Sequence, residues 1–341
     1  MKTISAAFVL ALMMVSSLPA ETIELKSGKS FRGRVVEQPG DRVVLDVGDG
    51  ITVTFFQDEI AGIHSDAQPR PEERHFLWEV KSDRTKVYLF GSIHLGKEDM
   101  YPLAGEVDGA FAGAGTLVVE VDTESIDPME AQRTVAQKGL LPADQLLESQ
   151  LDPKTFDKLQ ARFQKFGMPM DPMLRFKPWF IAVNLQVLQI KYLGYDEEYG
   201  VDRYFLRRAH GAGKKVLQLE TLEQQLDFLD RLPDQNMFLD YTLNSLDETE
   251  AMLEMILAAW QYGDAAAMEK LTIADMLQQF PETRPIFEII LFNRNKDMAA
   301  EIKRYLGTDE VYFVVVGAAH LVGDQGLVEL LRQEGFQVDQ L

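Results

Sequence analysis

Short apolar runs alternate with longer amphipathic stretches over most of the chain. Runs of β-branched and aromatic residues predict buried strands at 86–90, 116–121, 215–219 and 311–316. Helical periodicity lies between them, at 153–166, 201–212 and 281–306, and Gly213 is typical of a helix end. Residues 234–280 carry no strand signal and predict a helical insertion. The alternation indicates an α/β domain with a mostly parallel or mixed sheet and helical insertions.

The pattern before this domain has a period of two. Four short alternating runs lie within residues 21–64, separated by turns rich in Gly and Asp. They predict a small curled sheet or barrel, and the module resembles the SH3-like domains of bacterial envelope proteins. Residues 65–75 have the two prolines and the charges of a linker, so the main domain is expected at 76–341.

Residues 1–20 form a third kind of pattern. Lys2 precedes an apolar run at 4–15, which is followed by small residues up to Ala20. This order is typical of a secretory signal peptide, and the run is too short for a comfortable membrane span. We expect an exported protein, periplasmic or secreted, with no transmembrane span after cleavage; an uncleaved N-terminal anchor is the alternative. The apolar stretch 176–193 is interrupted by polar residues and predicts a core helix.

Composition excludes several functions. The 341 residues carry a net charge of −20, which would repel phosphate backbones, so we expect no nucleic-acid partner. The chain has no cysteine, which excludes disulfides, iron–sulfur clusters, thiolate zinc sites and a cysteine nucleophile. Any metal must therefore be bound by nitrogen and oxygen atoms. Only five histidines are present, so the position of each is informative.

Candidate chemistry follows the predicted strands. The first and last strands each run into a Gly-x-x-His segment, which places His94 and His320 just beyond them. Glu120 ends the second strand and Glu220 follows the third. Because the carboxyl ends of parallel strands share one edge of a sheet, these four side chains are expected at one rim. The glycines predict a tight turn off each strand, and the small residues a close approach of backbone to ligand.

Each of these residues also has a plainer interpretation. A histidine at a strand end can be structural, although two copies of the segment favour a metal ligand or a general base. Glu120, in a buried run, needs a cation or a donor, which could be a structural arginine. Glu220 could simply begin the helix at 221–231.

At these residues the chain resembles the TraB/GumN family, which includes pheromone-shutdown proteins and Tiki metalloproteases. The resemblance covers residues 76–341 and leaves the β-module outside. It is carried by LWEV (77–80), VYLFGSIHLG (87–96), TLVVEVD (116–122), YGVDRYFL (199–206), VLQLETLEQQ (216–225), Trp260, Gly263-Asp264, Arg294-Asn295, Met298 and VVVGAAHLVGDQGLVELLRQEGFQV (314–338).

The resemblance implies an α/β fold similar to erythromycin-esterase-like and ChaN-like proteins. It implies that His94, Glu120 and His320 form the active constellation and that Arg294-Asn295 is a family motif. For the Tiki branch it implies metal-dependent proteolysis of peptide N-termini. The expected function is therefore an exported metal-dependent hydrolase of peptidase type, acting on a peptide or another small substrate.

In the expected mechanism, His94, Glu120 and His320 hold a divalent metal or its water. Imidazole ligands favour Mn, Co or Zn over Mg. Arg294 would stabilise an oxyanion or bind a substrate carboxylate, with a helix salt bridge as the alternative. Substrate binding is expected of the remaining candidates, Glu220, Asn295, Asp202 and Tyr204.

Three alternatives stay open at this point. The first is a metal-free hydrolase in which His94 is the base and Glu120 orients it. The second is a non-catalytic envelope protein that captures peptide, haem or iron at the same rim. The third is an interaction protein that binds a protein partner through the β-module.

Overall fold

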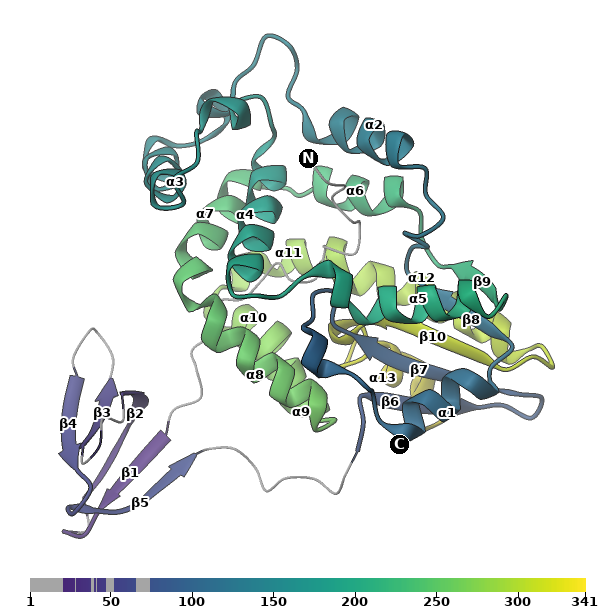
Figure 1. Ribbon diagram of the computed structural model, residues 1–341, viewed down its shortest axis with the longest axis horizontal. Coiled ribbons are helices and arrows are strands. Elements are labelled where there is room, and N and C mark those ends of the chain that lie inside the picture. Colours follow the sequence, from purple (N-terminus) through teal and green to yellow (C-terminus); the bar gives the residue numbers. More distant parts are fainter. Residues whose placement is uncertain (1–20, 28, 38–39, 41, 47–51, 66–73) are drawn as a thin grey trace. The chain divides into compact units, whose positions relative to one another are not determined.

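The computed structural model describes residues 21–27, 29–37, 40, 42–46, 52–65 and 74–341 (Figure 1). The expected signal peptide and most of the expected linker lie outside the described residues. The described residues fall into two compact units on either side of residue 73, and each is described by itself.

The first unit is an antiparallel β-sheet with the strand order β4-β3-β2-β1-β5. Its strands are β1 (Glu21–Leu25), β2 (Ser30–Glu37), β3 (Arg42–Asp46), β4 (Thr52–Phe56) and β5 (Ile60–Ser65). The four expected strands are present. A fifth strand, β5, pairs with β1 and was not expected, because it contains the weak β-formers Ala61 and Gly62. Ile23, Val43, Leu45 and Phe55 form its apolar core. The SH3-like character of this unit stays a prediction.

The second unit is built on a six-stranded sheet with the order β11-β6-β7-β10-β8-β9. Its strands are β6 (Leu77–Lys81), β7 (Lys86–Ser92), β8 (Thr116–Val119), β9 (Lys215–Gln218), β10 (Tyr312–Gly317) and β11 (Gln337–Gln340). Neighbours from β7 to β9 are parallel, and β6 runs antiparallel to both β7 and β11. The expected α/β domain with a mostly parallel, mixed sheet is thus confirmed. Similarity to the erythromycin-esterase and ChaN folds stays a prediction.

Two of these strands were not expected from the pattern. Strand β6 contains Glu79, a buried carboxylate that binds Lys81 and Lys86, each at 2.8 Å. This charged residue interrupts the apolar run, so the pattern did not indicate a strand. Strand β11 buries Val338 among polar residues, so a short edge strand leaves almost no hydrophobic signal.

Helices connect and cover the strands. They are α1 (Gly105–Gly113), α2 (Pro128–Gly139), α3 (Pro153–Lys165), α4 (Pro178–Tyr192), α5 (Val201–Gly211), α6 (Leu222–Asp230), α7 (Gln235–Ser245), α8 (Thr249–Gln261), α9 (Ala265–Glu269), α10 (Asp275–Gln279), α11 (Arg284–Phe287), α12 (Asn293–Leu306) and α13 (Leu327–Gln333). In Figure 1, α4, α7 and α8 lie to one side of the sheet. None of the helices in the described part of the chain is long and apolar enough to cross a membrane.

The predicted helices are confirmed with one correction. Helices α3, α4 and α5 match the expected segments, and Gly213 follows α5 with a φ of +66°. The stretch 281–306 is broken, however, into α11, a π-helical segment (Glu288–Phe292) and α12. Pro285 lies in the first turn of α11, where its missing amide donor is tolerated, and the π-helical segment changes the hydrogen-bond pattern of the helix after Phe287.

An aromatic cluster lies at the centre of the second unit. Phe313 on β10 is fully buried, and its ring centroid lies 4.9 Å from that of Phe205, 5.6 Å from Phe111 and 5.9 Å from Phe90. The cluster therefore joins the two central strands to α1 and α5. It thereby fixes β7 and β10, the strands that lead to His94 and His320, relative to these helices.

Replacing Phe313 by Ala should lower the free energy of unfolding of this unit by about 3–5 kcal/mol, because it opens a cavity between three rings. Chemical denaturation followed by tryptophan fluorescence measures the loss. Tyr192→Ala, at a side chain that is 82% exposed, is the control and should change it by less than about 0.5 kcal/mol. Equal losses in the two variants would contradict a central role for this cluster.

Candidate functional site

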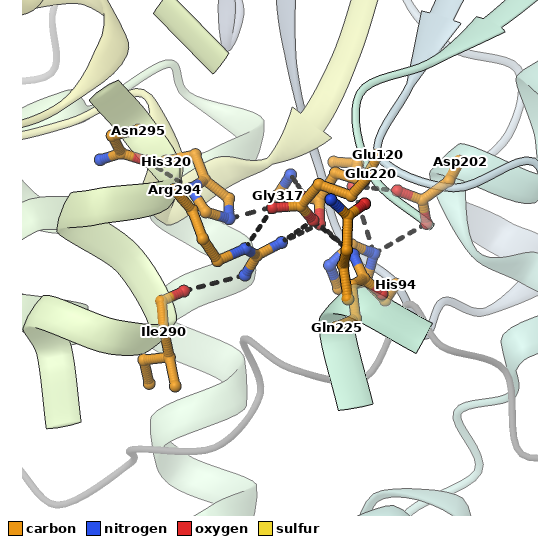
Figure 2. A network of polar contacts seen from close by, with 12 residues as sticks. His94, Glu120, Asp202, Glu220, Gln225, Ile290, Arg294, Asn295, Gly317 and His320 are labelled. Carbon is orange, nitrogen blue, oxygen red and sulfur yellow. Dashed lines mark hydrogen bonds and ion pairs between the residues drawn. The ribbon is translucent and has the colours of Figure 1, made fainter. Parts of the chain in front are cut away.

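Four adjacent parallel strands bring the candidate residues to one edge of the sheet. His94 follows β7, Gly317 ends β10 with His320 three residues later, Glu120 follows β8, and Glu220 lies two residues beyond β9. These strands are neighbours in the order β7-β10-β8-β9. Figure 2 shows the resulting network of polar contacts. The sequence prediction that these side chains meet at one rim is confirmed.

Arg294 holds two of the carboxylates together from the first turn of α12. It is 1% exposed, and its Nε and Nη2 donate to the two carboxylate oxygens of Glu220, each at 2.7 Å. Its Nη2 also donates to Glu120 Oε2 at 2.7 Å, and Nη1 donates to the carbonyl of Ile290 at 2.8 Å. Burial opposes the charge, but the carboxylates of Glu220 and Glu120 outweigh it and raise the pKa of Arg294. Arg294 is thus the structural partner that a buried Glu120 requires.

Gln225 completes this cluster and was not expected from the sequence. Its Nε2 donates to Glu120 Oε2 and to Glu220 Oε2, both at 3.0 Å. It lies on α6 and is 1% exposed. A signal was present, because Gln225 shares the buried stripe of α6 with Leu222, Leu226 and Leu229. A lone polar residue on an apolar helix face indicates a buried polar partner.

The two carboxylate oxygens of Glu120 have different hydrogen-bond donors. Its Oε2 accepts from Arg294 and Gln225, while its Oε1 accepts from the backbone N–H of Gly317 at 2.7 Å. Glu120 is buried, and these three donors offset the cost of removing its charge from water. The ends of β8 and β10 are therefore locked to each other by one side chain.

His94 is held by a carboxylate behind it. Its Nδ1 lies 2.9 Å from Oδ2 of Asp202 on α5, and Ser92 Oγ donates to the other carboxylate oxygen. Burial favours the neutral ring, but Asp202 and then Glu120 outweigh burial and raise the pKa of His94. The same pair lowers the pKa of Asp202, against the effect of its burial. This histidine is thus biased toward its charged form.

His320 has the opposite bias. Its Nδ1 contacts Oδ1 of Asn295, whose Nδ2 donates to the carbonyl of Gln325 at 2.7 Å. Because Asn295 presents its oxygen, His320 carries its proton on Nδ1 and leaves a lone pair on Nε2. Burial and then the charge of Arg294 lower the pKa of His320 well below its usual value.

The Nε2 atom of His320 is buried and lacks a hydrogen-bond partner among the described residues. It lies 3.8 Å from Glu120 Oε1. An unsatisfied nitrogen in a buried polar network calls for an explanation, since each such atom costs about 1–3 kcal/mol. The lone pair of His320 Nε2 can therefore bind a metal ion or accept a proton.

Gly317 leaves a small space between the two histidines and the glutamate. A Cβ on this residue would lie 3.2 Å from His94 Nε2, 3.4 Å from Glu120 Oε1 and 3.6 Å from His320 Cδ2. Gly317 and Gly91 lie within strands, and neither has a positive φ. A tight 3₁₀ turn, Ala318–His320, begins directly after Gly317, as expected, whereas β7 continues past Gly91 to Ser92. The expected approach of the backbone to a ligand stays a prediction.

Two imidazoles whose far nitrogens are fixed by Asp202 and Asn295 have the support that metal-ligating histidines have in proteins. The donor chemistry therefore fits a divalent metal at the Nε2 atoms. Among the described residues, however, no group of three His, Asp or Glu side chains is placed to hold an ion. The expected ligand set of His94, Glu120 and His320 is not assembled, because Glu120 is engaged with Arg294, Gln225 and Gly317.

The remaining candidates lie behind these groups. Glu220 and Asn295 are buried against Arg294 and His320, and Asp202 is bound to His94. Tyr204 stacks on Tyr101 with a centroid distance of 4.5 Å and accepts a hydrogen bond from Arg208 at 3.0 Å. Its described contacts thus belong to the packing of α5.

Replacing Arg294 by Met should lower the free energy of unfolding by about 3–5 kcal/mol, because two carboxylates then lose their buried cation. Adding Glu120→Gln and Glu220→Gln to this variant should restore part of the loss, since no buried charge then lacks a partner. Denaturation curves measure both. Lys303→Ala, which breaks an exposed pair with Glu334, is the control and should cost less than about 1 kcal/mol. A triple variant no more stable than Arg294→Met would contradict the electrostatic cause.

The pKa values of the two histidines should be shifted in opposite directions in chelator-treated protein, upward for His94 and downward for His320. At about pH 5.5, ¹⁵N shifts should show a charged His94 and a neutral His320. By linkage, the bond of His94 stabilises the fold at low pH, and this contribution is lost as pH rises through its raised pKa. Burial of His320 instead costs stability once pH falls below its usual pKa near 6.5. A common titration of both rings would contradict this asymmetry.

Comparison with known proteins identifies relatives of this chain. An uncharacterized protein of Escherichia coli (strain K12), YbaP, is 29% identical over 263 residues, covering 77% of this chain and 89% of its own. An uncharacterized protein of Treponema pallidum (strain Nichols) is 23% identical and covers 77% of this chain and 81% of its own. No solved structure matches the chain.

More distant relatives carry the name of an activity. A metalloprotease TIKI homolog of Amphimedon queenslandica is 21% identical, covering 79% of this chain and 62% of its own. Metalloprotease TIKI1 of Danio rerio is 23% identical and covers 80% of this chain and 64% of its own. The model of the TraB/PrgY/gumN family matches residues 76–340. Of the described α/β unit, residues 74–341, only the first two residues and Leu341 lie outside this match. The chain therefore belongs to the TraB/PrgY/gumN family.

Proposed function

We propose that this protein is an exported hydrolase that cleaves peptides with the help of a divalent metal. The observation that carries the proposal is the pair of buried imidazoles, held from behind by Asp202 and Asn295, beside Glu120 and the bare backbone of Gly317. The TIKI relatives, which are named metalloproteases, support the peptidase class.

His94 and His320 would hold the metal through their Nε2 atoms, with Glu120 as the nearest carboxylate. Nitrogen ligands favour Mn, Co or Zn. When bound, such an ion supplies a polarised carbonyl and a water with a pKa near neutrality.

The chain's own residues orient these groups. Asp202 fixes the ring of His94, and Asn295 fixes both the ring and the tautomer of His320. Arg294 is engaged with Glu220 and Glu120, so it acts as a positioning residue for Glu120. Glu220 and Gln225 in turn hold Arg294 and Glu120. Asp202, Asn295 and Glu220 would thus act on the substrate through the residues that they bind.

A metal-free mechanism is a second candidate, and the opposite pKa shifts of the histidines favour it. A charged His94 can donate a proton from Nε2, and a neutral His320 can accept one at Nε2. A pair of titratable groups with separated pKa values is the usual arrangement for acid–base catalysis. Chelator sensitivity distinguishes the two candidates.

Export rests on the signal-like pattern of residues 1–20, and the site would then lie in the periplasm or outside the cell. The β-sheet unit lies outside the family match and would supply a contact for a protein partner.

The function is tested on protein purified without an affinity tag. Wild-type protein should contain close to one equivalent of Mn, Co or Zn and should hydrolyse members of a peptide mixture followed by mass spectrometry. His94→Ala/His320→Ala should lose both properties, while Asp202→Asn should lower metal affinity or activity about 10- to 100-fold.

The matched control is His210→Ala, since His210 is a half-exposed histidine that also binds an aspartate, Asp122. It should retain metal and activity. Hydrolysis that survives a chelator and the loss of metal would replace the metal-dependent mechanism by the metal-free one. If no peptide is hydrolysed by metal-loaded protein, the peptidase proposal is wrong.

A further inference from the structure

An apolar pocket adjoins the reactive groups, between the residues that follow β7 and β10 and the helices α4, α8 and α9. Its wall is formed by Ile93 and Leu95 after β7, Ile190 on α4, Leu253 and Ile256 on α8, and Met268 on α9. His94, Gly317 and the two alanines that follow Gly317 also line it. The pocket and the candidate site thus share His94 and Gly317.

The pocket offers little to a polar guest. Apart from His94, its lining contains no ionisable side chain. It contains two hydroxyls, and both already donate within the protein: Ser92 to Asp202, and Thr272 to the carbonyl of Met268 at 2.7 Å. A charged group that entered would lose its water and gain few polar partners, since His94 and the oxygens of the two hydroxyls are the only polar side-chain groups of the lining.

Its size limits what can enter. The cavity volume is about 60 Å³. On this measure a single water needs about 10–15 Å³, so the pocket takes a group about the size of four to six waters. A branched aliphatic side chain of four carbons has that size, and a haem macrocycle does not fit.

From this contiguity, chemistry and size we propose that the pocket binds one aliphatic side chain, of the size of Leu or Ile, next to the scissile bond of the substrate. The proposal rests on the peptidase function proposed above and names its specificity. A side chain seated against Met268 and Ile256 brings the adjoining peptide group over Gly317. There, the space that a Cβ would occupy lies 3.2 Å from His94 Nε2 and 3.4 Å from Glu120 Oε1.

Thr272 is the residue through which the pocket can be closed with little damage to the fold. It is only half-buried, whereas Met268 and Ile256 are buried core residues. Thr272→Phe should fill the pocket. The matched control is Thr308→Phe: Thr308 is also half-buried and donates to a backbone carbonyl, that of Tyr305 at 2.8 Å, but it precedes β10 at the opposite edge of the sheet.

The first arm measures hydrolysis. A peptide that the wild-type protein cleaves is prepared with Leu, Ala or Asp on each side of the scissile bond. On one side, kcat/KM for Leu should exceed that for Ala about 10- to 100-fold, with Asp lower still. Thr272→Phe should reduce the Leu-to-Ala ratio at least about tenfold, and Thr308→Phe should leave the ratio unchanged. A flat ratio in the wild-type protein would overturn the proposal while leaving the peptidase function in place.

The second arm needs no turnover. In protein labelled with [¹³C]methyl methionine, the Met268 signal is assigned by its loss in Met268→Leu. The amide of N-acetyl-leucine should shift this signal, the corresponding Asp amide should not, and Thr272→Phe should abolish the shift. Failure of the Leu amide to shift Met268, or equal shifts with both amides, would overturn the proposal. A selective shift in a protein that hydrolyses no peptide would support the pocket and refute the peptidase function.

Discussion

The ion cluster of Arg294, Glu120 and Glu220 is the interaction on which the rest of the site depends. It joins α12 to the ends of β8 and β9, and Glu120 extends it to β10 through the N–H of Gly317. Two carboxylates and one guanidinium leave one negative charge in surplus, which the donors of Gln225 and Gly317 help to stabilise. The surplus acts on His94, whose pKa Glu120 helps to raise. The cluster therefore fixes both the geometry and the charge of the rim.

The two Gly-x-x-His segments are alike in sequence and different in surroundings. A carboxylate backs His94, whereas an amide backs His320. Arg294 further disfavours a charge on His320, since its guanidinium lowers the pKa of that ring. A repeated motif thus produces two chemically distinct imidazoles, one biased toward the charged form and one toward the neutral form. The difference in pKa comes from the helices, since α5 supplies Asp202 to His94 and α12 supplies Asn295 to His320. The similar strand ends would not produce it.

The parts of the fold that could be predicted from the sequence are those marked by strongly apolar strands and by local signals. The strands β7, β8, β9 and β10 were each marked by a short apolar run, and their parallel order then implied one shared rim. Strand β9 is not the buried strand that was expected, because it lies at the edge of the sheet and its side chains are exposed or half-buried. It did not predict contacts made by residues distant in sequence. Gln225 reaches Glu120 across more than a hundred residues, and the edge strand β11 has no apolar run to mark it. Arg294 could be identified as a candidate, but its partners Glu220 and Glu120 depend on how α12 returns to the sheet.

Gly317 explains why the central strand, rather than a loop, is the meeting point of these features. Its N–H binds Glu120, its missing side chain leaves room beside His94, and its backbone lines the apolar pocket. Any larger residue would press on His94 Nε2 at 3.2 Å. At Gly317 the ladder to β7 continues, whereas the ladder to β8 ends at Val315 and the N–H of Gly317 binds Glu120 instead. A substrate placed over Gly317 would therefore meet the imidazoles, the carboxylate and the pocket at positions that the sheet itself maintains.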